Sequence, residues 1–295
     1  MKKPMERKLS LGGVASTGTN ATGCLNDDNF NVIGSMLSFD AVVFDMDGVI
    51  TKTATVHSLA WKKMFDEYLR RRETQYKEPF REFTHSPDYL SFVDGRPRYQ
   101  GVDTFLRSRA INLPYGEPRD NPGKETVCGL GNRKDELFNK VVEEQGVEVY
   151  ESTIKLIEEL LGKGVKLGVA TSSKNCLLLL EKAGITHFFS TRVDGVVSAQ
   201  LGLKGKPEPD IFTTATDNLG VERHRAVVVE DAVSGVQAGA KGHFGLVLGV
   251  AREHNAKELR SNGADFVVED LAEINVAELD KLVASKQRGK QPLTV

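Results

Sequence analysis

The chain has 295 residues, of which 40% are hydrophobic and 27% are charged, and its formal net charge at pH 7 is −2. This near balance of charges does not indicate a nucleic acid or a membrane surface as partner, so we expect a small-molecule ligand. The three cysteines are scattered without metal-ligand spacing, and no apolar run approaches the roughly 20 residues of a membrane helix. With no secretory signal pattern at the N-terminus, we expect a globular, monomeric protein of the cytoplasm.

The first part of the chain predicts a tail, one strand and then a series of helices. Residues 1–37 are rich in Gly, Ser, Thr and Asn without periodicity, which is typical of a mobile tail. The apolar run at 41–44 predicts a buried strand. Apolar residues then recur at helical spacing from Val56 to about Arg72, and again over 101–111 and 133–146. These helices therefore form an insertion after the first strand.

From Tyr150 onward, helices alternate with short apolar runs. Strands are predicted at or near 165–170, 193–197, 226–229, 245–248 and 266–268. Repeated strand–helix units imply a parallel sheet with helices on both faces. The predicted fold class is therefore α/β, with a Rossmann-like parallel sheet core and an inserted α-helical cap. The predicted parts are a core over 38–54 and 149–285, a cap over 55–148, and a frayed C-terminus over 286–295.

Two carboxylates directly follow the first predicted strand. Asp45 and Asp47 belong to an Asp-x-Asp-Gly turn that Gly48 completes. Open α/β sheets place their chemistry at the carboxyl ends of strands. One acid of such a pair can act as nucleophile and metal ligand while the other carries a proton. The alternative is an ordinary Asp-Gly turn with solvated acids.

Hydroxyls and a cation follow the predicted strand at 165–170. The residues are Thr171, Ser172, Ser173, Lys174 and Asn175. Hydroxyls and free backbone N–H groups at a helix N-terminus favour an anion, and an adjacent lysine strengthens the site. The segment is therefore a candidate phosphate site. Its alternative role is that of an ordinary helix N-cap.

A lysine and a further pair of acids complete the candidate residues. Lys206 lies in a Lys-Pro-Glu-Pro loop, where it could neutralise a transferring phosphoryl group, although many such lysines only face solvent. Glu230 and Asp231 follow the predicted strand at 226–229. Carboxylates clustered opposite Asp45 suit Mg²⁺. Acids at a helix start also occur simply to balance the helix dipole.

The combination of these motifs resembles a known superfamily. Asp45-Met46-Asp47-Gly48-Val49-Ile50-Thr51 resembles the first motif of the haloacid-dehalogenase superfamily, and the residues that follow it, Thr53, His57 and Trp61, resemble those of its β-phosphoglucomutase-like branch. The Thr-Ser-Ser-Lys-Asn, Lys-Pro-x-Pro-x-x-Phe and Glu-Asp motifs follow in the superfamily's order. The resemblance covers roughly residues 39–275.

The resemblance implies a chemistry for the core residues. Asp45 would attack phosphorus to form an aspartyl-phosphate, and Asp47 would act as general acid and base. Thr171 would hold the reacting phosphoryl group, and Lys206 would neutralise charge. A Mg²⁺ ion would be held by Asp45, Asp231, the backbone carbonyl of Asp47 and, through water, Glu230. Alignment and charge neutralisation are what phosphoryl transfer mainly requires.

The resemblance also implies roles for residues around the sugar. His57 would couple to Lys134 of the cap, although a histidine on a helix surface often has no such role. Arg98 would grip the distal phosphate, with Arg96 as its competitor. The remaining predicted substrate-binding residues are Thr53, Ser172, Ser173, Lys174 and Asn175.

Three positions depart from the family pattern. Asp94 stands where the family has a lysine, Lys52 replaces an acid, and Tyr150-Glu151-Ser152 replaces Tyr-Pro-Gly. These departures leave the chemistry intact and leave the identity of the sugar open. Three functions therefore stay open: a β-phosphoglucomutase, a Mg²⁺-dependent sugar or polyol phosphatase, and a non-catalytic sugar-phosphate-binding module.

Overall fold

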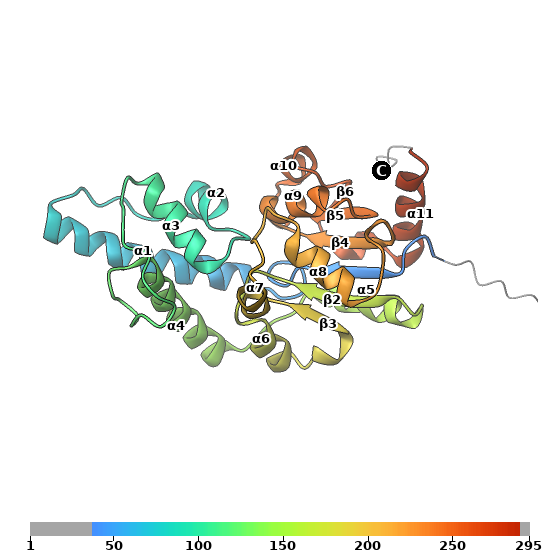
Figure 1. The fold of residues 1–295 in the computed structure, drawn as a ribbon, viewed down its shortest axis with the longest axis horizontal. Coiled ribbons are helices and arrows are strands. Elements are labelled where there is room, and N and C mark those ends of the chain that lie inside the picture. Colours follow the sequence, from blue (N-terminus) through green and yellow to red (C-terminus); the bar gives the residue numbers. More distant parts are fainter. Residues whose placement is uncertain (1–36, 290–295) are drawn as a thin grey trace, which may run out of the picture. The chain divides into compact units, whose positions relative to one another are not determined.

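The protein is built on one six-stranded parallel sheet (Figure 1). The computed structural model describes residues 37–289, so all but the last residue of the tail predicted over 1–37 lies outside the described residues. The strand order is β3-β2-β1-β4-β5-β6, with every neighbouring pair parallel. The strands are β1 (Ala41–Phe44), β2 (Lys166–Ala170), β3 (Thr191–Val193), β4 (Ala226–Glu230), β5 (Leu246–Val250) and β6 (Phe266–Val268).

Helices cover both faces of this sheet, because the side chains of each strand alternate between the two faces. Val42 and Phe44 of β1 belong to an apolar cluster with residues of α5, α6 and α11. Ala41 and Val43 belong to a second cluster with residues of α8 and α9 on the other face. The helices after the insertion are α5 (Glu151–Gly162), α6 (Cys176–Lys182), α7 (Gly195–Leu201), α8 (Asp210–Asn218), α9 (Val233–Lys241), α10 (Ala256–Ser261) and α11 (Val276–Gln287).

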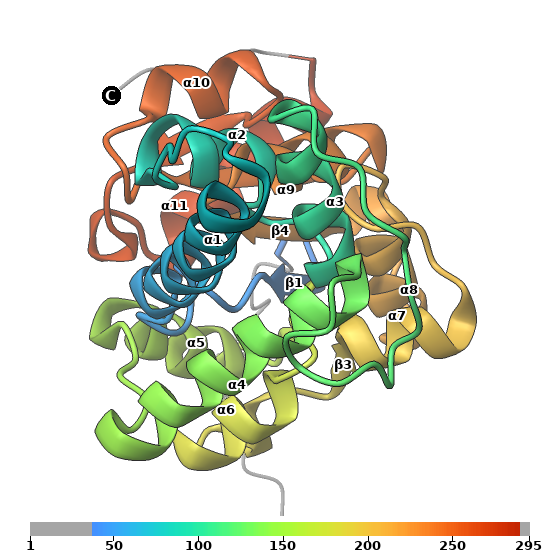
Figure 2. The ribbon, with the colours of Figure 1, turned by 90° about the vertical axis from the view of Figure 1, so that its left-hand side faces the viewer.

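A helical insertion separates β1 from β2, and the α/β fold with an inserted cap is confirmed. Its helices are α1 (Ala54–Tyr76), α2 (Leu90–Phe92), α3 (Arg98–Ser108) and α4 (Val127–Gln145). Stacked and tilted aromatic rings of Trp61, Phe65, Phe83 and Phe105 fill the space between them. Figures 1 and 2 place α1, α3 and α4 beyond the carboxyl ends of the strands. Residues 37–289 belong to one compact unit, so the predicted bounds between core and cap stay a prediction.

Two segments differ from the sequence-based expectation. The strand predicted near 193–197 is instead β3, which ends at Val193, followed by α7. The Asp194 side chain accepts hydrogen bonds from the backbone N–H groups of Val196 and Val197, and this cap starts a helix where an apolar run had suggested a strand.

The C-terminal segment differs as well. We expected fraying from residue 286, but α11 extends to Gln287, and Lys286 Nζ donates to Asp265 Oδ2 at 2.5 Å and to the carbonyl of Phe244 at 3.1 Å. Over residues 37–289, none of the helices combines the length and hydrophobicity needed to cross a bilayer.

Candidate active site

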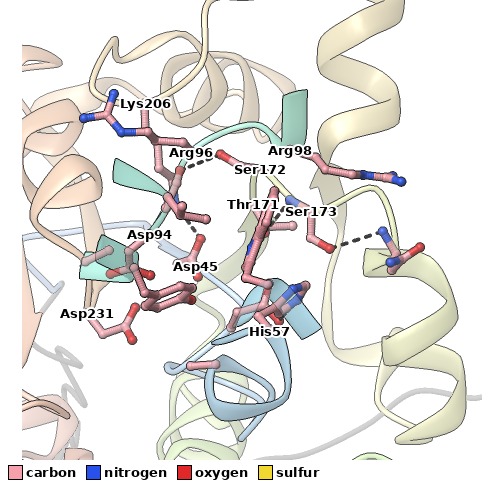
Figure 3. Close-up of a pocket in the computed structure, with 18 of the residues that line it drawn as sticks. Asp45, His57, Asp94, Arg96, Arg98, Thr171, Ser172, Ser173, Lys206 and Asp231 are labelled. Carbon is pink, nitrogen blue, oxygen red and sulfur yellow. Dashed lines mark hydrogen bonds and ion pairs between the residues drawn. The ribbon is translucent and has the colours of Figure 1, made fainter. Parts of the chain in front are cut away.

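Three polar side chains lie where neighbouring parallel strands end. Asp45 directly follows β1, Thr171 directly follows β2, and Glu230 is the last residue of β4. Because β1 lies between β2 and β4, the three residues meet at one edge of the sheet. Each is at most 5% exposed. Figure 3 shows Asp45 and Thr171 close together, and both line the cavity.

Lys206 joins this group from the loop before α8. Its Nζ lies 2.5 Å from Asp45 Oδ1 and 2.6 Å from Glu230 Oε2, and its side chain is 1% exposed. Burial alone would lower the pKa of Lys206, but the two carboxylates outweigh burial and raise the pKa. The ammonium group therefore stays charged between the two acids.

Asp45, Glu230 and Asp231 form a cluster of carboxylates. One oxygen of each lies within 4.8 Å of the others. Burial, followed by repulsion from Glu230, raises the pKa values of Asp45 and Asp231 well above the usual range. An additional cation would offset this repulsion, and hard oxygen ligands suit divalent ions such as Mg²⁺. The residues present could therefore bind a metal ion.

The loop after β1 leaves room for the Asp231 side chain. Gly48 has a φ of +87°, and a Cβ at this position would lie 1.8 Å from Asp231 Oδ2. The carbonyl of Gly48 accepts a hydrogen bond of 2.9 Å from Arg252 Nε, whose guanidinium group lies 3.7 Å from the centre of the Tyr150 ring. No local pattern indicated this role for Arg252, because it comes 204 residues after the glycine.

Asp47 is held by two residues from the start of the insertion. Thr53 Oγ1 donates a hydrogen bond to Asp47 Oδ1, and His57 Nε2 lies 3.2 Å from the same oxygen without hydrogen-bond alignment. Burial would raise the pKa of Asp47, but His57 and Thr53 outweigh burial and lower it. Thr53 is 3% exposed and lies outside the cavity lining, where it contacts Asp47, so its predicted role in substrate binding stays a prediction.

Lys134 of α4 connects this pair to the cap. Its Nζ and His57 Nδ1 are hydrogen-bonded, and the His57 ring stacks on Phe138 with 4.0 Å between the ring centroids. Burial, and then repulsion from Arg98, lowers the pKa of Lys134 to about 7. Burial and the nearby Lys134 also lower the pKa of His57. The structure thus brings together the two residues that we expected to couple.

A second group of polar residues lines another part of the same cavity. Figure 3 shows Arg98 on the side opposite Asp231. Arg98 Nη1 lies 2.9 Å from Asp135 Oδ2, while Asn175 Nδ2 donates to Asp135 Oδ1 at 2.8 Å. Lys174 Nζ lies 4.9 Å from the centre of the Tyr99 ring. These cations and amide donors form a candidate anion site separate from the acid cluster.

The cap loop before α3 closes onto the core through backbone contacts. Ser172 Oγ donates to the carbonyl of Gly95 at 2.8 Å, and Ser234 Oγ donates to the carbonyl of Asp94 at 3.2 Å.

Burial, and then repulsion from Glu230, raises the pKa of Asp94 to about 6. Arg96 lines the cavity and forms no ion pair with any residue of the described range 37–289. Arg98, in contrast, is paired with Asp135.

With the exception of Thr53, the residues that the sequence indicated all line this one cavity. The sequence analysis missed Asp135, which binds both Arg98 and Asn175, and Tyr89, which lines the cavity beside Asp94. Asp135 directly follows Lys134, and only its position next to that residue could have indicated it. Tyr89 lies in the part of the insertion for which no element was predicted.

Comparisons with known proteins identify relatives of this chain. The family described as haloacid dehalogenase-like hydrolase matches residues 39–243. A β-phosphoglucomutase of Mycobacterium bovis is 43% identical over 246 residues, which cover 82% of this chain and 94% of that protein. A β-phosphoglucomutase of Bacillus subtilis is 29% identical over 238 residues, covering 80% of this chain and 92% of that protein.

A solved structure supports the fold assignment. The crystal structure of β-phosphoglucomutase from Clostridium difficile matches with a TM-score of 0.66 and 21% sequence identity, covering 85% of this chain and 99% of that chain. At this identity the likeness concerns the fold. The family match over residues 39–243 and the relative at 43% identity show the family as well as the fold. This chain belongs to the haloacid dehalogenase-like hydrolase family.

Proposed function

We propose that the protein is a β-phosphoglucomutase, which interconverts β-D-glucose 1-phosphate and glucose 6-phosphate through a sugar bisphosphate. The similarity to proteins of that name supports this choice. The single observation that carries it is that one cavity holds two separate groups of phosphate-binding type. Lys206 and Thr171 lie beside Asp45, and Arg98 and Lys174 lie in the other part. A sugar with a phosphate at each end would use both.

Asp45 is the proposed nucleophile. One of its carboxylate oxygens attacks phosphorus, the bond from phosphorus to the sugar oxygen breaks, and an aspartyl-phosphate forms. In the reverse direction, a sugar hydroxyl attacks this phosphorus and Asp45 is released. Lys206, whose Nζ lies 2.5 Å from Asp45 Oδ1, neutralises charge on the transferring group. The hydroxyl of Thr171 is available to hold a phosphoryl oxygen.

Asp47 is the proposed general acid and base. It takes the proton of the attacking hydroxyl and returns a proton to the sugar oxygen that leaves in the opposite step. Its contacts with Thr53 and His57 hold its carboxylate in place, and Lys134 connects His57 to the cap. Binding of a sugar phosphate beside Lys134 would therefore influence when Asp47 is free to exchange protons. Such control favours transfer to sugar over transfer to water.

Mg²⁺ is the proposed cofactor. Asp45, Asp231 and Glu230, together with the backbone carbonyl of Asp47, would hold it, because their oxygens are hard ligands and the carboxylates lie close together. When bound, the ion would offset the negative charge of the carboxylates and of the phosphoryl oxygens. The cytoplasmic location and the monomeric state stay predictions.

A coupled assay with phosphorus NMR tests the proposed function. The wild-type enzyme should convert β-glucose 1-phosphate to glucose 6-phosphate, with a trace of glucose 1,6-bisphosphate required for full rate. Stoichiometric release of inorganic phosphate instead would favour the sugar phosphatase. An Asp45→Ala variant with unchanged activity would refute the role of Asp45 in both enzymatic functions. A wild-type protein that converts β-glucose 1-phosphate neither to glucose 6-phosphate nor to inorganic phosphate would favour a non-catalytic module.

A further inference from the structure

Asp135 joins the cap to the core through one carboxylate. It lies on α4, and its Oδ2 is 2.9 Å from Nη1 of Arg98 at the start of α3. Its Oδ1 accepts a hydrogen bond of 2.8 Å from Asn175, which precedes α6 in the core. One oxygen thus binds a group of the cap and the other a group of the core. Because α3 and α4 belong to the insertion and Asn175 does not, this side chain spans the cleft between them.

The same carboxylate stands among three cations. Burial, and then repulsion from Arg98, lowers the pKa values of Lys134 and Lys174, and Asp135 acts in the opposite direction on both. Replacing the carboxylate with a neutral group would leave these cations facing one another. Like charges at short range repel, so the side chains would then move apart. Asp135 therefore keeps the cations close together as well as oriented.

Donors remain available beside this carboxylate. A guanidinium group has five N–H donors, and Arg98 directs Nη1 toward Asp135. Lys174 forms no ion pair with any residue between 37 and 289; its contact is with the Tyr99 ring. These donors can bind a phosphate while Asp135 holds Arg98 and Asn175 in place. Donors that are already oriented lose less conformational freedom when a ligand binds.

We propose that Asp135 is a positioning residue that makes the cavity selective for sugars carrying a distal phosphate. It orients Arg98 and Asn175 and ties the cap to the core without contacting the phosphate. This inference rests on the proposed function, since it assigns the distal phosphate to those donors. Asp45 lies in the other part of the cavity, so a phosphoryl donor that has no distal phosphate does not depend on Asp135.

The test compares Asp135→Asn with Glu136→Gln. Glu136 is the next residue of α4 and undergoes the same change of charge, but its partner is Arg133 at 3.3 Å and its side chain is 52% exposed. For each enzyme, KM and kcat are measured with β-glucose 1-phosphate in the presence of glucose 1,6-bisphosphate. Release of acetate from acetyl phosphate is measured in parallel, because phosphorylation of Asp45 by this donor uses no distal phosphate.

For Asp135→Asn we expect KM for β-glucose 1-phosphate to rise about tenfold or more, with a smaller change in kcat, because the donors lose their orientation. Its kcat/KM for acetyl phosphate should stay within about twofold of the wild type, since Asp45 and Lys206 are untouched. Glu136→Gln should match the wild type with both substrates. If Asp135→Asn does not fold, Asp135→Glu replaces it, with the same selective loss expected because the carboxylate is displaced by one methylene.

Three results would overturn the inference. The first is a KM of the folded variant equal to that of Glu136→Gln. The second is an equal loss with β-glucose 1-phosphate and with acetyl phosphate in a folded variant, which would indicate a general structural role. The third is a wild-type enzyme that only releases inorganic phosphate from β-glucose 1-phosphate. This last result refutes the proposed function and the inference with it, whereas the first two leave the proposed function standing.

Discussion

Replacing Lys206 with methionine should destabilise the fold, because the buried carboxylates around it then have no cation between them. Lys206 is 1% exposed and contacts Asp45 at 2.5 Å and Glu230 at 2.6 Å. Removing one partner of a buried ion pair lowers the free energy of unfolding by about 3–5 kcal/mol. We expect a loss of this size for Lys206→Met near neutral pH in the absence of divalent metal.

The loss should become smaller as the pH falls. The pKa values of Asp45 and Asp231 are already raised in the wild type, and without Lys206 they should rise further. A carboxyl group with a raised pKa in the folded state makes that state bind more protons than the unfolded state. Its stabilising effect is therefore present at low pH and is lost as the pH rises. The variant should differ most from the wild type near neutral pH and least in acid.

Urea unfolding, followed by circular dichroism in EDTA at about pH 7.5 and about pH 5.5, measures this difference. Lys241→Met is a matched control, because Lys241 forms an ion pair of 2.8 Å with Glu208 but is 48% exposed. Its loss should be about 0–1 kcal/mol. Added Mg²⁺ should restore part of the stability of Lys206→Met, since a ligand of the folded state stabilises it. A loss below about 1 kcal/mol, or one that is equal at both pH values, would refute the reasoning.

Three further predictions follow from the same contacts. Asp47→Asn should lower the rate of sugar phosphate conversion by about 10²–10⁴-fold. The rate of acetyl phosphate turnover should fall less, because acetate leaves without a proton. Equal losses of the two rates would count against an acid–base role of Asp47. Gly48→Ala should lower the free energy of unfolding by about 1–2 kcal/mol and weaken Mg²⁺ binding. The reason is that the alanine Cβ would lie 1.8 Å from Asp231 Oδ2. An unchanged Mg²⁺ affinity, measured by calorimetry, would contradict this prediction. Between about pH 7 and pH 9, the free energy of unfolding of the wild type should rise by up to about 2–3 kcal/mol relative to that of Lys134→Met. The reason is that the pKa of Lys134 is about 7 in the folded protein, so the unfolded chain binds more protons in this range. A difference between the two proteins that stays constant with pH in urea unfolding would exclude this pKa.

Local patterns were enough to predict much of the fold. Apolar runs bounded by turn residues placed five of the strands within a few residues of their observed positions. The strand predicted near 193–197 was wrong, because a short apolar run is compatible with either a strand or a helix. Here the Asp194 side chain caps the N-terminus of a helix. The predicted start of fraying at residue 286 was too early, since α11 extends to Gln287 and Lys286 binds Asp265; residues 290–295 lie outside the described residues.

The sequence by itself placed Asp45, Thr171 and Glu230 at the carboxyl ends of predicted strands. Each follows or ends an apolar strand, and parallel strands carry their carboxyl ends to the same edge of the sheet. That the three residues are neighbours depends on β1 lying between β2 and β4, and only the structure shows this order. The prediction that Lys206 lies at the same edge of the sheet rested only on the resemblance to a known family.

Tertiary structure alone decided which residues join the two sides of the cavity. The carboxylate of Asp135 binds both Arg98 and Asn175, and Arg252 supports the carbonyl of Gly48 from far along the chain. Neither contact has a periodic signal, because each depends on how the insertion packs against the core. That packing results from many side-chain contacts acting together, so residues at such junctions become recognisable only once the elements are assembled.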